Sequence, residues 1–125
     1  MGALGLALLC VALNAAAGGE PPAAAAQDEI RRLLATLEES GCEFARNGKW
    51  YPAGEARRHL ERKYAEAVRR DVIRSSEDFI RHVASASSIS GEPYQVRCKP
   101  AEAVPSAVWL NRELMRYRSR TGAGN

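Results

Sequence analysis

Three cysteines constrain the fold of this 125-residue chain more than any other feature. Cys10 lies in an apolar run, whereas Cys42 and Cys98 lie in the charged remainder of the chain. If processing removes Cys10, an even pair is left, and in an oxidising compartment such a pair is most simply a disulfide. Two buried free thiols are the alternative. The meaning of the cysteines therefore depends on the N-terminal segment.

The N-terminal segment indicates export. Residues 4–13 are apolar and uncharged, and the small residues at 15–17 suit a signal peptidase, so residues 1–17 are predicted to be a signal peptide. The run is too short to cross a bilayer, which takes roughly 20 apolar residues in a helix. The mature chain is therefore expected to have no stable transmembrane segment. No Lys or Arg precedes the run, which departs from a usual signal peptide, and a buried core helix or a disordered start is the alternative to export. Cys10 also raises a lipoprotein alternative, which Leu9 disfavours because a small residue is expected before the cysteine.

Residues 18–26, GGEPPAAAA, have the composition of a linker. Pro21 and Pro22 prevent a helix from running through this segment. Cleavage is expected between Ala17 and Ala26. The formal net charge of the whole chain is +3, with both signs interspersed.

Apolar spacing predicts several elements in the remaining chain. Residues 27–40 read as a helix that ends at Gly41. Asn47-Gly48 is a hairpin signal, because a type I′ turn needs positive φ at both central positions. The other expected elements are a helix over 53–70, a helix capped by Ser75 with Asp78 reaching back, a strand over 94–98, a helix over 107–118 and a flexible tail over 119–125.

These elements predict a helix-rich α+β fold, a single small domain with a short antiparallel sheet. Because large apolar residues are sparse, a covalent link between Cys42 and Cys98 would matter. Closing a loop of roughly 57 residues is expected to contribute about 4 kcal/mol to stability. Residues 27–118 are the predicted domain.

The arginines of the long helix raise a polyanion-binding interpretation. Five of them fall within residues 57–70, but Glu55, Glu61, Glu66 and Asp71 are interleaved with them. Such mixing is typical of a solvated helix face with i,i+4 ion pairs. Export also argues against nucleic acid and favours an acidic envelope polymer or headgroup as the partner.

Candidates for catalysis are few. His59 follows Glu55 by one helical turn, a spacing that can tune a general base. The serines at 85, 87, 88 and 90 lack the G-x-S-x-G pattern, and serines near a helix end usually bond to backbone. Ser87 falls toward the core side of its helix. No metal-ligand spacing or cofactor motif is present, so no metal and no cofactor are expected.

Three stretches, FARNGKWY at 44–51, EARRHLERKY at 55–64 and SEDFIRHVASASSISGEPYQVRC at 76–98, resemble the YfeK-like family of small exported bacterial proteins, a domain of unknown function. The resemblance implies a periplasmic or secreted protein with no assigned activity. It draws attention to polar residues that packing explains poorly. The binding candidates are Arg46, Asn47, Tyr51, His59 and Lys63.

Two functional hypotheses follow. The first is a non-enzymatic envelope module that binds an envelope protein or an acidic envelope ligand, and not nucleic acid, through a polar patch including Arg46, His59 and Lys63. The second is a small hydrolase or transferase that uses His59 with Ser87 or Ser88. The two separate on geometry, because the second requires a hydrogen bond between His59 and a serine hydroxyl.

Overall fold

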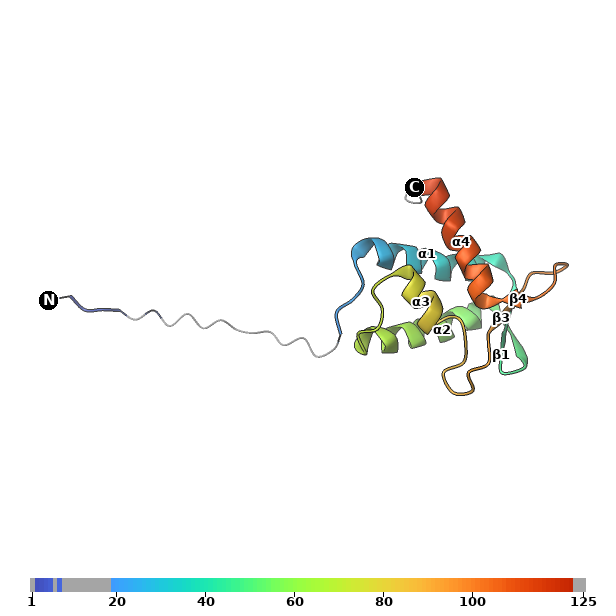
Figure 1. The fold of residues 1–125 in the computed structure, drawn as a ribbon, viewed down its shortest axis with the longest axis horizontal. Coiled ribbons are helices and arrows are strands. Elements are labelled where there is room, and N and C mark those ends of the chain that lie inside the picture. The colour runs from blue at the N-terminus through green and yellow to red at the C-terminus, as the bar shows by residue number, and fades with distance from the viewer. Residues whose placement is uncertain (1, 6, 8–18, 123–125) are drawn as a thin grey trace.

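The computed structural model describes residues 2–5, 7 and 19–122. Its elements are α1 (Ala24–Ser40), β1 (Glu43–Arg46), β2 (Lys49–Pro52), α2 (Ala53–Arg69), α3 (Ser76–His82), β3 (Gln95–Arg97), β4 (Val104–Pro105) and α4 (Ser106–Thr121). Figure 1 shows α1, α2 and α3 grouped together, α4 crossing this group, and the sheet at one end of it. The predicted α+β class with one small domain is confirmed.

The sheet is antiparallel and has the strand order β2-β1-β3-β4. Asn47 and Gly48 form the β1–β2 turn with φ values of 50° and 77°, as the hairpin signal predicts. In β1, Phe44 faces the core and is paired with Tyr51 and Val96 on the two neighbouring strands. This register places Arg46 at the end of β1, beside the turn.

The core lies where the apolar stripes of the helices meet the sheet. Leu60 of α2 and Phe79 and Ile80 of α3 are buried, and Tyr94 joins them beside β3. Helix α1 contributes Ile30, Leu33, Leu34 and Leu37, and α4 contributes Leu110 and Leu114. Helix α1 contacts all three other helices, so its burial holds the helical layer together.

A disulfide joins Cys42, just before β1, to Cys98, just after β3. The predicted pairing is thus present, and it connects neighbouring strands whose cysteines lie 56 residues apart in sequence. Such a link stabilises the fold because it closes a long loop and so lowers the conformational entropy of the unfolded chain.

Several boundaries differ from those expected. Helix α1 begins at Ala24, inside the predicted linker, and α4 continues to Thr121, inside the predicted tail. Helix α3 ends at His82, before the serines at 85–90, and the two-residue strand β4 was not among the expected elements. The predicted cap is present: Ser75 accepts from the Asp78 amide, and the Asp78 carboxylate reaches back and accepts from the backbone of Arg74.

Part of the predicted linker packs against the helical layer. The Gly19 amide donates to the carbonyl of Arg69, and the Glu20 amide donates to the Asp71 carboxylate, which fastens this segment to the end of α2. Most of the predicted signal peptide lies outside the described residues. In the described part of the chain, no helix has both the length and the apolar character needed to cross a bilayer.

Candidate functional site

His59 is the centre of a polar cluster on α2. Arg46, at the end of β1, places Nη1 2.6 Å from Nδ1 of His59. A guanidinium can only donate, so Nδ1 accepts and the ring proton must reside on Nε2. His59 Nε2 lies 3.1 Å from the hydroxyl of Tyr94 and donates to it. Both ring nitrogens are therefore engaged, and the tautomer is determined by Arg46.

Lys63 lies one turn after His59 and contacts the same cluster through Tyr94. Its ammonium donates to the Tyr94 hydroxyl and to the carbonyl of Ala86, each at 2.9 Å. Ala86 follows α3, so Lys63 links α2 to the segment that leads into the serine turn. The Tyr94 ring is 1% exposed, and its hydroxyl accepts from both Lys63 and His59. Lys63 thus has a structural role, which the sequence did not predict.

The electrostatics keep His59 neutral. Partial burial, followed by the charges of Arg46, Lys63 and Arg62, lowers the pKa of His59 to about 4. Burial and the Arg46 charge also lower the pKa of Lys63 to about 8. At neutral pH the imidazole is therefore uncharged and surrounded by cationic side chains. Such a site favours the binding of an anionic group.

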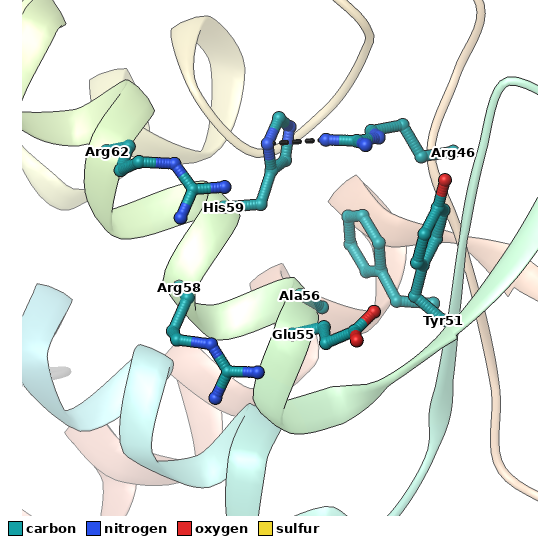
Figure 2. A pocket seen from close by; sticks show the side chains of 8 residues that line it. Arg46, Tyr51, Glu55, Ala56, Arg58, His59 and Arg62 are labelled. Carbon is teal, nitrogen blue, oxygen red and sulfur yellow. Dashed lines mark hydrogen bonds between the residues drawn. The ribbon is translucent and has the colours of Figure 1, made fainter.

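A pocket of about 250 Å³ opens beside His59. We call it the basic pocket; its lining residues are Phe44, Arg46, Tyr51, Glu55, Ala56, Arg58, His59 and Arg62. Figure 2 shows the side chains of Arg46, Arg58 and Arg62 around His59, with Tyr51 beside Arg46. The Arg46 guanidinium carbon lies 5.0 Å from the Tyr51 ring centroid, within cation–π range. Glu55 is the one carboxylate in this lining.

The arginines of α2 separate into two groups. Arg57 pairs with Glu38 and Glu61, while Arg69 and Arg70 pair with Glu66, as expected for a solvated face. Within the described residues, Arg58 and Arg62 have neither an ion pair nor a hydrogen bond. Both are exposed, as a solvated face implies, but they lack the ion pairs expected there and line the basic pocket. The polyanion-binding interpretation of the α2 arginines included these two, but they were not among the predicted binding residues, although their i,i+4 spacing along the face next to His59 was a usable signal.

The predicted binding residues do not all come together. Arg46, Tyr51 and His59 line the basic pocket, whereas Lys63 does not line it and donates to Tyr94, which also accepts from His59. Asn47 lies in the β1–β2 turn, where its Oδ1 accepts from the Ser90 hydroxyl at 2.6 Å. Asn47 therefore joins the hairpin to the serine turn and does not line the basic pocket.

The serine run forms a turn closed by its own hydrogen bonds. The Ser87 hydroxyl is buried and accepts from the amides of Ile89 and Ser90, each at 3.3 Å. The Ser85 hydroxyl donates to the carbonyl of Arg81. Ser88 is exposed and makes no hydrogen bond to His59 in the described part of the chain. The His59–serine bond that the enzyme hypothesis requires is not formed.

The described residues contain no group of three or more His, Cys, Asp or Glu side chains placed to hold a metal ion. The site is rich in hydrogen-bond donors, because three arginines and a lysine surround a neutral imidazole. The fold and site therefore define a small disulfide-linked α+β protein with a basic, solvent-open pocket.

The chain belongs to a family of unknown function, DUF5329, whose family model matches residues 24–118. The match begins at the first residue of α1 and includes every residue of the site. It does not confirm the finer YfeK-like name. Searches of the curated proteins and of the solved structures found no significant match.

Proposed function

We propose that this protein is an exported bacterial envelope protein that binds an acidic ligand in the basic pocket. The observation that carries the proposal is the convergence of Arg46, Arg58 and Arg62 on one pocket that contains a single carboxylate, Glu55. Charge-assisted hydrogen bonds from guanidinium groups to carboxylate or phosphate are among the strongest that a protein makes. A ligand with such a group would contact guanidinium groups that form no ion pair with any carboxylate of the described chain.

Binding is favoured over the hydrolase or transferase alternative for a geometric reason. A general base needs a lone pair directed at the proton it removes. The Nδ1 lone pair of His59 accepts a hydrogen bond from Arg46, and Nε2 carries a proton and donates a hydrogen bond to the Tyr94 hydroxyl. The imidazole is thus arranged to orient Arg46 rather than to activate a serine.

Export is supported by the apolar segment at residues 4–13 and by the disulfide, because disulfides persist mainly in oxidising compartments. The test is the intact mass of the protein made in a bacterial host from its full sequence. We expect a chain shortened at its N-terminus and lighter by two hydrogens than the reduced form. An uncleaved chain with free thiols would overturn the envelope assignment.

The binding proposal is tested with two probes, inorganic phosphate and galacturonic acid, titrated into the disulfide-bonded protein at low ionic strength. A saturable rise in melting temperature is expected from at least one probe. The double variant Arg58→Gln/Arg62→Gln should weaken that response at least tenfold and keep the stability of the free protein, because neither side chain has a partner in the described structure. Arg120→Gln, which removes an exposed charge of α4, is the control. If neither probe binds the wild-type protein saturably, the proposal fails.

A further inference from the structure

A second pocket adjoins the basic pocket. It has a volume of about 490 Å³ and is lined along α2 by Lys63, Glu66, Ala67 and Arg70, and across from α2 by Val72, His82 and Ser88. His59 and Arg62 line both pockets. We call the two together the α2 groove, since they share a boundary and follow one helix.

The sequence of α2 explains why the groove is continuous. Glu55, His59, Arg62, Glu66 and Arg70 follow one another at intervals of three or four residues, so they lie along one face of the helix. From Arg58 to Arg70 the helix axis advances about 18 Å at 1.5 Å per residue. A single phosphate or monosaccharide is too small to contact both ends of such a groove.

The charge of the protein is concentrated in this groove. Its lining carries five cationic side chains, Arg46, Arg58, Arg62, Lys63 and Arg70, against two carboxylates, Glu55 and Glu66. The chain has 18 cationic and 15 acidic side chains, so the remaining thirteen cations are balanced by thirteen carboxylates. The whole formal net charge of +3 therefore resides in the groove. Charge focused along a line in a concave surface favours a linear polyanion.

We propose that the α2 groove binds a linear acidic polysaccharide, with negatively charged units in both pockets. The proposal rests on the proposed function and extends it by naming the ligand class. Tyr51 lines the first pocket and Ala67 and Val72 line the second, and their apolar surface suits the apolar faces of sugar rings, which a polyphosphate chain lacks. Single-stranded nucleic acid is less well matched, because it uses successive stacking aromatics. Of the two aromatic residues that line the groove, Phe44 is 1% exposed, which leaves Tyr51 alone.

The first test is the dependence of affinity on ligand length. Galacturonic acid, its dimer and its octamer are titrated into the disulfide-bonded protein by calorimetry at constant ionic strength. We expect the octamer to bind more than tenfold tighter per chain than the monomer, which exceeds the eightfold gain that eight equivalent units provide statistically. Equal affinity per unit overturns the proposal while leaving single-anion binding in the basic pocket, and thus the proposed function, intact.

The second test locates the far end of the ligand. Arg70 and Arg69 are neighbours, both pair with Glu66, and only Arg70 lines the groove. Arg70→Gln should weaken octamer binding several-fold and leave monomer binding unchanged, whereas the matched control Arg69→Gln should change neither. If both variants have the same effect on octamer binding, the second pocket does not bind the ligand and the proposal is overturned.

The third test separates the class of polymer. Long-chain polyphosphate and an oligothymidylate of comparable length are titrated under the same conditions. We expect both to bind more weakly than the octamer at equal ionic strength. Tighter binding of either one, with the same loss in Arg70→Gln, would assign the groove to that polymer and overturn the polysaccharide assignment.

Discussion

Arg46 donates a hydrogen bond to Nδ1 of His59 across 2.6 Å, although 13 residues separate the two in sequence. The bond joins the end of β1 to the middle of α2 and requires a neutral imidazole, because a protonated ring offers no acceptor. It also holds the guanidinium at the basic pocket. The protonation state of His59 is therefore coupled both to the stability of the fold and to the arrangement of the pocket.

Stability should fall as the pH drops from 6.5 toward 4. The pKa of His59 is about 4 in the folded protein against an ordinary 6.5, so over this range the unfolded state binds more protons. We expect a loss of about 1–2 kcal/mol in the free energy of unfolding, less than the full shift implies because the ring is partly solvated. Denaturant titrations at the two pH values measure it. His59→Gln, which can keep both hydrogen bonds, should reduce the loss, whereas His82→Gln should not; equal losses in all three proteins would contradict the coupling.

Lys63 is expected to matter for stability as well as for charge. Lys63→Met should lower the free energy of unfolding by about 1–3 kcal/mol, because the Ala86 carbonyl and the Tyr94 hydroxyl lose a donor. Lys49→Met removes an exposed lysine from the hairpin and should change it by less than about 0.5 kcal/mol. Denaturant midpoints compare the two. Unchanged stability in Lys63→Met would mean that Lys63 serves binding alone.

The serine turn can be tested in the same way. Ser87→Ala should cost about 1 kcal/mol, because the amides of Ile89 and Ser90 lose their acceptor. Ser88→Ala should leave the melting temperature nearly unchanged, since Ser88 is exposed. A larger effect at Ser88 than at Ser87 would show that the turn is not held as described.

Gly19 is expected to be intolerant of a side chain. A Cβ there would overlap the carbonyl oxygen of Val68 and come within 2.8 Å of the Asp71 backbone, so Gly19→Ala should detach the segment and lower the melting temperature. Gly54 offers a control in the first turn of α2, where a Cβ would meet its nearest atoms at 3.8 Å. Gly54→Ala should preserve or raise the melting temperature, because alanine favours a helix over glycine by up to about 1 kcal/mol. A neutral Gly19→Ala would indicate that the packed segment contributes nothing to stability.

Removal of the disulfide should have the largest effect on stability. The double variant Cys42→Ala/Cys98→Ala is expected to lose about 4 kcal/mol of unfolding free energy, because the unfolded chain regains the entropy of a long loop. Adding a reductant should lower the denaturation midpoint of the wild-type protein and leave that of the variant unchanged. A wild-type protein that is insensitive to reductant under unfolding conditions would argue against the bridge.

The sequence by itself determined the elements whose signals are local. The spacing of Ile30, Leu33 and Leu37 indicates α1, and Asn47-Gly48 predicts the hairpin turn, because helix periodicity and positive φ depend on neighbouring residues alone. The even cysteine pair pointed to the Cys42–Cys98 link once Cys10 was set apart. The two-residue strand β4 escaped this reasoning, since so short a segment becomes a strand only when β3 lies beside it.

Only the tertiary structure decided which charges remain available. Arg57 and Arg58 are neighbours in one helix, yet Arg57 meets Glu38 of α1 whereas Arg58 faces the basic pocket. Nor do spacing rules bring Arg46 to His59 or place the Tyr94 hydroxyl between His59 and Lys63. Such contacts depend on how β1, α2 and the segment before β3 pack around a shared core, and side-chain ion pairs and pKa shifts follow from that packing rather than from local sequence.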